Sequence, residues 1–449
     1  NVYVWEGSSG TTTLVSESIS APGQRGNDHS QDPVISGDGA YVAFVSRATD
    51  LVFGETGPAG YNMYIWERSS GTTTLVSESV LAPGQRANNS SYGGTISDDG
   101  GYLTFASLAT DLVSGGSGPA TQNVYVWERS SGTTTLVSES VSAVGQRGSH
   151  GSSLAVVSGN GEYVVFDSQA TDLVSGGSGP AVPNVYVWER SSGSTTLVSE
   201  SVTAAGQRGN SNSSQPEISD DGAYVAFLSA ATDLVPGGSG PANWNVYVWE
   251  RSSGALSLVS ESASVAGLRG DNTSTDALIS NDGAFVAFSS HATDLVSGGS
   301  GFSGYANVYL WERSSHALTL VSESVSATGQ SGDSDSTFPV ISGDGTHVAF
   351  LSYATDLVSG ASGPLTQNVY LWERLSGTTT LISPSISVAE QRADSDTYHL
   401  DIGGDGAHVT FRSEASDLIQ RDFNGNSDVF LWSSGAPADT TPPSLRELA

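Results

Sequence analysis

The sequence predicts an all-β fold, a seven-bladed β-propeller with four antiparallel strands in each blade, and three observations favour it. A motif written NVYVWERSSGTTTLVSES at 123–140 recurs along the chain, with a period of about 61 residues. Each period contains four short runs rich in β-branched residues, and those runs are apolar on both faces. The period is marked most clearly by Trp5, Trp66, Trp127, Trp188, Trp249, Trp311, Trp372 and Trp432.

The four strands of one period are two hairpins joined by longer polar segments. The first hairpin turns at Asp-Gly, a pair that favours tight turns because both central residues adopt positive φ at low cost. The second hairpin turns at Ser-Ser-Gly. In order, the segments are the first hairpin 32–46, the connection 47–61, the strands 62–68 and 72–79, and the connection 80–94.

The third strand of each period predicts how the sheets pack. In one copy, Val124 and Val126 alternate with Tyr125 and Trp127, so both faces of the strand are apolar. A sheet that is apolar on both faces must lie between two others. Four-stranded sheets stacked around an axis satisfy this condition and leave only short edges. We therefore expect the periodic Trp side chains to be wedged between blades, with a structural role.

Three motifs make the repeat resemble the TolB-like propeller family of bacterial secreted and cell-surface proteins. They are ISGDGAYVAF, ATDLV and NVYVWERSSGTTTLVS, and together they cover about 1–434. The resemblance implies the propeller fold. It implies no single function, since such propellers serve as binding platforms, assembly scaffolds and, less often, enzymes.

The two ends of the chain predict how the ring closes. Seven first hairpins accompany eight copies of the third strand, so one copy is surplus. We expect 398–434 to share the last blade with 1–18, with 428–433 as its third strand, 11–18 as its fourth and 1–6 as an outer fifth strand. The propeller then spans 1–434. An alternative is that a spare strand pairs with a neighbouring molecule. The strand residues involved are Val2, Tyr3, Val4, Trp5, Val429, Phe430, Leu431 and Trp432.

The segment 435–449 contains Pro437, Pro442 and Pro443, which cannot donate ladder hydrogen bonds. The sequence therefore predicts a linker or tail there. The chain opens at Asn1 partway through a repeat, which is consistent with a preceding signal peptide or further repeats.

Composition narrows the classes of partner. The chain carries 47 Asp and Glu against 16 basic residues, all of them Arg, for a formal net charge of −31. Nucleic acid and anionic membrane surfaces are disfavoured, because binding them needs a concentrated basic face. No apolar run is long enough for membrane insertion. Cys is absent, so neither disulfides nor thiolate metal sites contribute.

The repeated charged residues favour structural roles. A carboxylate after Thr or Ser typically accepts backbone N–H bonds and fixes a loop. We expect this of Asp50, Asp111, Asp172, Asp233, Asp294, Asp356 and Asp417. The Arg of the GQRG motif and the Glu and Arg of WER are expected to form ion pairs at blade edges or in loops.

One loop departs from the repeat and is a candidate Ca²⁺ site. Asp422, Asn424, Asn426 and Asp428 alternate around a Gly-bent turn, which suits the six to eight oxygen ligands of Ca²⁺. The bidentate Glu of an EF-hand is missing. An ordinary Asn-Gly turn is the alternative, and no cofactor is required by the rest of the sequence.

Three aromatic residues in the connections equivalent to 47–61 fall outside the period: Tyr61, Trp244 and Tyr305. An exposed Trp between Asn243 and Asn245 could stack on a sugar ring while the amides bind its hydroxyls. These five residues are the candidate ligand site. Isolated exposed aromatics are also common on surfaces without function.

The sequence contains no nucleophile elbow, zinc-protease motif or phosphate loop. We therefore predict a non-catalytic extracellular or cell-surface propeller that acts as a structural or protein-interaction module, within a larger surface assembly or filament. A glycan-binding propeller is the alternative. A carbohydrate-active enzyme is a third hypothesis, since Asp32, Glu217, Asp276, Asp401 and His399 lie on or near the first strands.

Overall fold

The structure is a computed structural model that describes residues 1–297, 304–386, 391–419, 426–434 and 444–448. Strands and connecting loops make up the described part of the chain, and none of it is a helix long and apolar enough to cross a membrane.

The described strands form seven four-stranded antiparallel sheets and one two-stranded sheet, so the fold is a seven-bladed β-propeller as predicted. Sheet orders are β3-β4-β5-β6, β7-β8-β9-β10, β11-β12-β13-β14, β15-β16-β17-β18, β19-β20-β21-β22, β23-β24-β25-β26 and β27-β28-β29-β30, and β1 pairs with β2.

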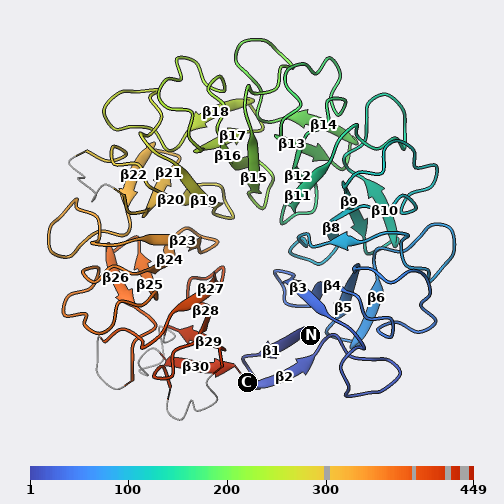
Figure 1. Ribbon diagram of the computed structural model, residues 1–449, viewed down its shortest axis with the longest axis horizontal. Coiled ribbons are helices and arrows are strands. Elements are labelled where there is room, and N and C mark those ends of the chain that lie inside the picture. The colour runs from blue at the N-terminus through green and yellow to red at the C-terminus, as the bar shows by residue number, and fades with distance from the viewer. Residues whose placement is uncertain (298–303, 387–390, 420–425, 435–443, 449) are drawn as a thin grey trace. The chain divides into compact units, whose positions relative to one another are not determined.

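The chain divides into two compact units, Asn1–Ala223 and Tyr224–Ala449. The strands of the first unit are β1 (Tyr3–Glu6), β2 (Thr11–Leu14), β3 (Ser30–Ile35), β4 (Tyr41–Ser46), β5 (Asn62–Glu67), β6 (Thr72–Leu75), β7 (Ser91–Tyr92), β8 (Tyr102–Ser107), β9 (Asn123–Glu128), β10 (Thr133–Leu136), β11 (Ser152–Val157), β12 (Tyr163–Ser168), β13 (Asn184–Glu189), β14 (Ser194–Leu197) and β15 (Ser213–Ile218). In Figure 1 the sheets β3–β6, β7–β10 and β11–β14 follow one another in chain order from blue to green.

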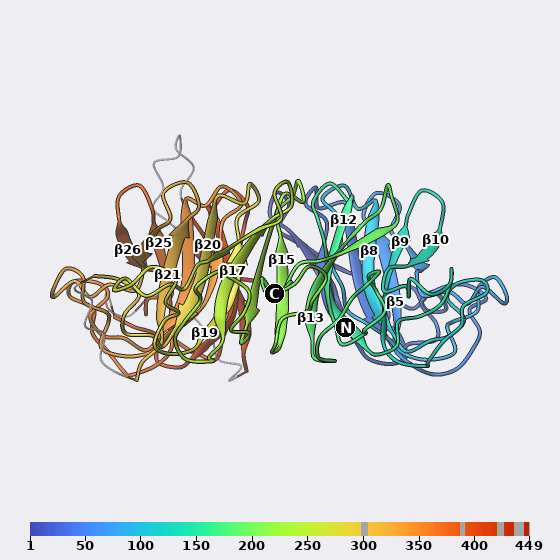
Figure 2. The ribbon, with the colours of Figure 1, turned by 90° about the horizontal axis from the view of Figure 1, so that it is seen from above.

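The second unit repeats the same plan. Its strands are β16 (Tyr224–Ser229), β17 (Asn245–Glu250), β18 (Ala255–Leu258), β19 (Ser274–Ile279), β20 (Phe285–Ser290), β21 (Asn307–Glu312), β22 (Ala317–Leu320), β23 (Ser336–Ile341), β24 (His347–Ser352), β25 (Asn368–Glu373), β26 (Thr378–Leu381), β27 (Thr397–Ile402), β28 (His408–Ser413), β29 (Asp428–Ser433) and β30 (Ser444–Leu448). In Figure 2 its strands β20, β21 and β25 stand side by side, with their connections at the two ends of the strands.

The turn between the first two strands of a sheet differs from the predicted one. Only Gly39 has positive φ (66°), and Asp38 does not. Asp38 instead acts through its carboxylate, which accepts bonds from the Ser36 hydroxyl at 2.6 Å and the Ala40 N–H at 2.9 Å. The Ser36 hydroxyl lowers the pKa of Asp38 most, followed by the Ala40 amide. The Asp thus caps the turn while the Gly supplies the left-handed residue.

Adjacent sheets in the first unit pack through opposite faces. One face of β3–β6 presents Phe44, Tyr64 and Trp66, which pack with Val2 and Val15. The other face presents small aliphatic residues that pack against the aromatic face of β7–β10. Each sheet therefore buries rings on one side and aliphatic groups on the other, as the alternation in the third strands predicted.

The periodic Trp residues confirm this packing in seven of the eight copies. Trp66, Trp127, Trp188, Trp249, Trp311, Trp372 and Trp432 are each at most 8% exposed. Trp5 is only partly buried, because it lies in the two-stranded sheet β1–β2.

The last sheet corrects the predicted blade closure. Its third strand is β29, as expected, and β29 pairs with β28. Its fourth strand, however, is β30, which pairs with β29 from Val429↔Leu448 to Ser433↔Ser444. The expectation that 11–18 supplies this strand was wrong, and so was the assignment of all of 435–449 to a linker. A segment close in sequence loses less entropy on pairing than one from the far end of the chain. All three Pro of this tail precede Ser444 in sequence, so they do not interrupt the strand.

Candidate functional site: the bulged first strands

In six of the seven sheets the third residue of the first strand is unusual, and in the second sheet the equivalent Gly93 directly follows the two-residue strand β7. Six of these seven residues are non-glycine and have φ between 48° and 54°, in the left-handed region that bulky side chains rarely adopt. We call the seven places the bulge positions. They are Asp32, Gly93, Leu154, Gln215, Asp276, Phe338 and His399.

The left-handed residue belongs to a β-bulge. In β11, Ser152 and Ser153 pair with Ser168 and Asp167, but the register then shifts before Val156. The same shift occurs in β3, β19, β23 and β27. A bulge breaks the ladder locally and turns a side chain away from the sheet. Here it turns one residue per first strand outward.

The bulge side chains are accessible and lie close to one another within a unit. Leu154 is 51% exposed and Phe338 is 57% exposed, although both are large and apolar. Asp32, Gln215 and His399 are also exposed. A Cβ built on Gly93 would lie 3.6 Å from the Cβ of Asp32, so the positions of consecutive sheets are neighbours. The bulge positions of the first two sheets therefore adjoin each other.

The bulge positions vary where the surrounding residues do not. The strand residue two places before the bulge is Ser in six sheets and Thr in the seventh, and it is buried in each. The bulge itself carries acidic, amide, aliphatic, aromatic or imidazole side chains. Sequence reasoning missed this site, although the contrast between a fixed neighbour and a varied position was present in the repeat. Only Asp32, Asp276 and His399 were noted, as residues on or near the first strands that an enzyme could use.

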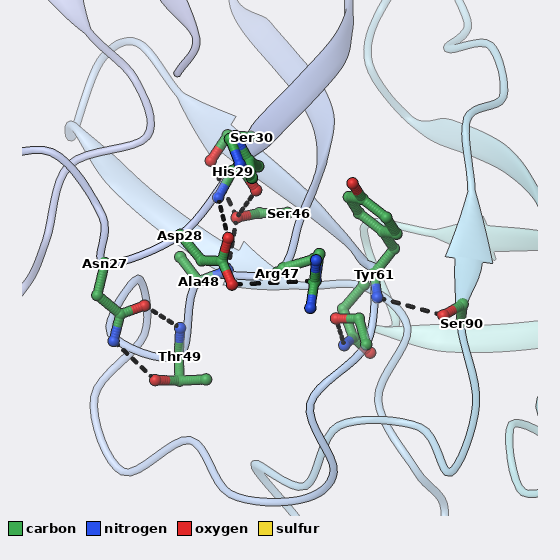
Figure 3. Close-up of polar contacts among 12 residues, drawn as sticks. Asn27, Asp28, His29, Ser30, Ser46, Arg47, Ala48, Thr49, Tyr61 and Ser90 are labelled. Atoms are coloured by element: carbon green, nitrogen blue, oxygen red, sulfur yellow. Dashed lines mark hydrogen bonds and ion pairs between the residues drawn. The ribbon is translucent and has the colours of Figure 1, made fainter.

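Figure 3 shows the polar contacts that position the first of these strands. The hydroxyls of Ser30 and Ser46 lie 2.9 Å apart, and the Ser46 hydroxyl also donates to the His29 carbonyl at 3.1 Å. Asn27 and Thr49 exchange two hydrogen bonds, at 2.8 Å and 2.9 Å. These buried and loop contacts hold the segment that leads into the bulge, just before its strained residue.

Burial is the largest influence on the pKa values of two carboxyl groups on or beside the first strands, Asp167 on β12 and Glu217 on β15. Burial raises the pKa of Asp167, opposed by hydrogen bonds from the hydroxyls of Ser214 and Ser153. Glu217 is partly exposed by surface area, yet its carboxyl lies deep enough that burial raises its pKa to about 7. No group of three or more His, Asp or Glu with metal-binding geometry occurs in the described part of the chain.

The predicted ligand residue Tyr61 lies beside the first bulge strand. Its hydroxyl is 3.5 Å from the Gln31 amide oxygen, and Gln31 donates to Asp32 at 3.2 Å. The Arg47 guanidinium lies 5.7 Å from the centre of its ring, and Arg47 also faces Asp28 at 3.9 Å (Figure 3). Tyr61 is partly buried against the core between the first two sheets. It therefore borders the bulge positions.

The other predicted ligand residues fall into different surroundings. Trp244 is partly buried and packs against the core that joins β15–β18 to β19–β22. Asn245 is fully buried: it donates to the Asn243 carbonyl at 2.8 Å and accepts from the Ser260 hydroxyl at 3.0 Å. Asn243 is partly buried, and its side-chain amide donates to the Asp271 carbonyl at 3.3 Å, whereas Tyr305 is 40% exposed. Tyr305 precedes β21, so Trp244 and Tyr305 belong to neighbouring sheets.

The candidate Ca²⁺ loop falls mostly outside the described residues. Asp422 and Asn424 are not among them, whereas Asn426 and Asp428 are, and Asp428 begins β29. The Ca²⁺ assignment therefore stays a prediction. The loop-fixing role of the periodic Asp is confirmed: Asp50, for example, accepts the Asn27 N–H at 3.0 Å, and Asp111, Asp172, Asp294, Asp356 and Asp417 accept equivalent backbone bonds.

The predicted assembly strands differ from each other. On β1, Tyr3 is 45% exposed while Val4 and Trp5 are partly buried; Val2, just before it, is 2% exposed. β1 pairs only with β2 in the described structure. β29 has partners on both sides; Phe430, Leu431 and Trp432 are buried, and Val429 is 44% exposed.

Comparison with known proteins places this repeat in a family. A family model described as a family of unknown function, DUF7453, matches residues 1–356. The chain belongs to this family. A search of curated proteins found no match.

The solved structures that this DUF7453 member resembles include TolB proteins, as its motifs led us to expect. TolB from Acinetobacter baumannii is 12% identical over 83% of this chain and 73% of that chain, with a TM-score of 0.36. A putative TolB from Agrobacterium tumefaciens is 14% identical over 70% of this chain and 86% of that chain, with a TM-score of 0.36. A prolyl endopeptidase structure is 12% identical over 94% of this chain, with a TM-score of 0.51, and the match spans 50% of that chain. At such identities the likeness concerns the fold.

Proposed function

We propose that this protein is a non-catalytic propeller that binds a protein partner through its bulge positions. One observation carries the proposal: a strained, exposed and varied side chain recurs at the same place in first strands whose neighbouring Ser or Thr residues are buried and nearly uniform. Each non-glycine residue held at positive φ costs on the order of 1 kcal/mol or more. Strain that is retained at side chains open to solvent, such as Leu154 and Phe338, supports a role in binding.

The chemistry of the bulge positions supports a peptide-like partner. Leu154 and Phe338 offer apolar contacts, and Asp32 and Asp276 offer carboxylates. In a chain of net charge −31, a partner with Lys or Arg beside apolar residues would be attracted electrostatically. A large, acidic, cysteine-free repeat is also consistent with an extracellular or cell-surface location within a larger assembly.

A peptide library displayed on phage and selected on the full chain tests the proposal. We expect selected peptides to combine basic and apolar residues, and their affinity to fall about tenfold or more in Leu154→Ser or Phe338→Ser. Phe53→Ser is the control, because Phe53 is 88% exposed in a connecting loop away from the bulge. Peptides whose affinity responds to Phe53→Ser but to neither bulge variant would contradict the proposal.

The glycan-binding alternative rests on Tyr305, the one exposed member of the predicted ligand set, and on the partly buried Asn243. A glycan array probed with the full chain distinguishes it. A signal that is lost in Tyr305→Ala and retained in Leu154→Ser would favour sugar binding over the peptide partner. We expect no such signal, since Trp244 and Asn245 are turned into the core.

A further inference from the structure

A buried Arg recurs in the connection that follows the fourth strand. In the second sheet, Arg147 Nε donates to the Pro119 carbonyl at 3.1 Å and Nη2 donates to the Gly118 carbonyl at 2.9 Å. These two bonds fix the guanidinium. Its third nitrogen, Nη1, takes part in neither of them. The same pair of bonds holds Arg86, Arg208, Arg269 and Arg392, and each of the five Arg is at most 5% exposed. Among these five Arg, the expected ion pair is described at Arg86, whereas the other four bind backbone carbonyls instead.

In the first sheet, the Nη1 atom of the equivalent Arg lies beside a carboxylate. Arg86 Nη1 lies 3.3 Å from Glu55 Oε1, and the side chains of both residues are almost fully buried. The Tyr64 hydroxyl donates to the same carboxylate oxygen. Burial raises the pKa of Glu55, but the Tyr64 hydroxyl and the Arg86 guanidinium oppose that rise. A carboxylate is thus held between a guanidinium and a phenol.

The other sheets lack this carboxylate. The position of Glu55 is taken by Gly116, Gly177, Gly238 and Ala361 in the sheets of Arg147, Arg208, Arg269 and Arg392. A Cβ built on Gly116 would lie 3.2 Å from Arg147 Nη1, so this position adjoins the guanidinium.

The guanidiniums beside these small residues are poorly satisfied. Nη1 of Arg147 and Nη1 of Arg392 are buried and have no hydrogen-bond partner in the protein. Nη1 of Arg208 and Arg269 make only long bonds to backbone carbonyls, at 3.4 Å and 3.5 Å.

A buried guanidinium cannot shed its charge, because Arg does not deprotonate in proteins. Leaving one unpaired costs several kcal/mol. Within the described residues, Arg86 is the one member of the set with a carboxylate oxygen within 4.0 Å. Asp111 lies near enough to Tyr125 to raise its pKa; its Oδ1 accepts the Asn88 N–H, and its Oδ2 is buried without a hydrogen-bond partner. The charge therefore calls for an anion from solution.

We propose that the sheets containing Arg147, Arg208, Arg269 and Arg392 each bind a small monovalent anion such as chloride. The anion takes the place of the Glu55 carboxylate, between Nη1 and the hydroxyl of the sheet's buried Tyr. Those hydroxyls belong to Tyr125, Tyr186, Tyr247 and Tyr370. The Tyr247 hydroxyl is buried without a partner in the protein, whereas the other three donate to backbone carbonyls at 3.2–3.4 Å, as the Tyr64 hydroxyl also does at 3.4 Å. A small anion fits best, because the Gly116 position also lies 3.2 Å from a Val113 methyl group.

Bromide replaces chloride and can be located by its anomalous scattering. In crystals of the full chain grown with sodium bromide, we expect a peak beside each of the four unneutralised Arg and none beside Arg86. The fifth sheet has Ser331 at the Arg position, so no peak is expected there. Water without anomalous signal at all four Arg, or an equal peak beside Arg86, would overturn the proposal.

A matched variant tests the role of the carboxylate. Ala361 already carries a Cβ, so Ala361→Glu adds an acidic group without placing a new Cβ beside the backbone. The Ala361→Glu variant should lack the bromide peak beside Arg392 and should keep the peaks beside the other three Arg. Glu55→Gly should create a peak beside Arg86.

In solution, the wild-type melting temperature should be higher in sodium chloride than in sodium gluconate at equal ionic strength, because gluconate is too large to enter. Equal melting temperatures would contradict the proposal even if a variant fails to fold.

Discussion

The sequence NVYVWE occurs at the start of the chain and again as β9, in nearly opposite surroundings. In β9, Tyr125 is 1% exposed and Trp127 is 5% exposed. At the N-terminus, Tyr3 is 45% exposed and Trp5 is partly buried, although Val2 is as buried as Val124. β9 has a strand on each side, whereas β1 pairs only with β2 in the described structure. The same Tyr and Trp are thus buried in one copy of the motif and partly exposed to solvent in the other.

This difference shows that burial of these residues requires a complete four-stranded blade around the motif, and that the motif alone is not sufficient. Val2 is buried because it packs on the complete sheet β3–β6. Tyr3 and Trp5 lie on the opposite face of β1. Arg25 shows the same effect, since it donates to the exposed Tyr3 hydroxyl at 2.9 Å, while its counterpart Arg147 is buried. A sequence repeat therefore overstates structural equivalence at the ends of the chain.

The largest expected effect separates the two copies of the Trp. Trp127→Ala removes a buried indole and should cost about 3–5 kcal/mol of unfolding free energy. Trp5→Ala should cost less than about 2 kcal/mol, since the indole of Trp5 is already partly hydrated. Urea unfolding of both variants checks the difference.

The aliphatic face of the same strands is the control for this comparison. Val2→Ala and Val124→Ala remove equally buried methyl groups and should destabilise by similar amounts, about 2 kcal/mol each. Equal costs for the two Trp variants, or unequal costs for the two Val variants, would show that β1 is not the half-exposed copy that the structure describes.

The next effect compares Glu217 with Val156, which has the equivalent place in another first strand. Burial raises the pKa of Glu217 to about 7, so the folded state holds the proton more tightly than the unfolded state. The stability from this group is complete below its unfolded pKa, near 4.5, and is lost as pH rises through about 7. Glu217→Gln should match wild type near pH 4.5 and be more stable by about 2 kcal/mol at pH 8.

Urea unfolding of Glu217→Gln and wild type across pH 4.5 to 8 measures that difference directly. Glu217→Val, which copies the residue of the β11 strand, is the second variant and should show the same loss of pH dependence. A stability difference that stays constant with pH would mean that the Glu217 carboxyl is hydrated.

The repeat allowed most of the blade to be predicted. The buried Trp, the loop-fixing Asp and both hairpins follow from local pattern and period, because they depend on residues within one unit. The role of the GQRG Arg could not be predicted in this way. Arg147 binds carbonyls 28 and 29 residues earlier, so its burial depends on how two connections pack. The fourth strand β30 was missed because three Pro precede it and the repeat motif is absent there.

The bulge positions were missed for a different reason. Neither Leu154 nor Phe338 is a residue that indicates positive φ, and no Gly or Asn marks the register shift. The Ser152 hydroxyl, at the start of β11, donates to the Ser168 hydroxyl at 2.8 Å, so this strand is anchored two residues before the bulge by a residue distant in sequence. A position that local preference opposes and tertiary structure enforces cannot be found from propensity.

The smallest effect tests whether that strain is real. Leu154→Gly should raise the unfolding free energy by roughly 1 kcal/mol, since Gly adopts φ near 48° without the steric cost of a Cβ. Leu154→Ala is the matched control: it removes the same exposed side chain but keeps the Cβ, so its stability should stay close to that of wild type. The stability gained in Leu154→Gly is reduced because Gly increases the conformational entropy of the unfolded chain. Urea unfolding of the three proteins measures it, and a Gly variant less stable than the Ala variant would show that Leu154 is unstrained.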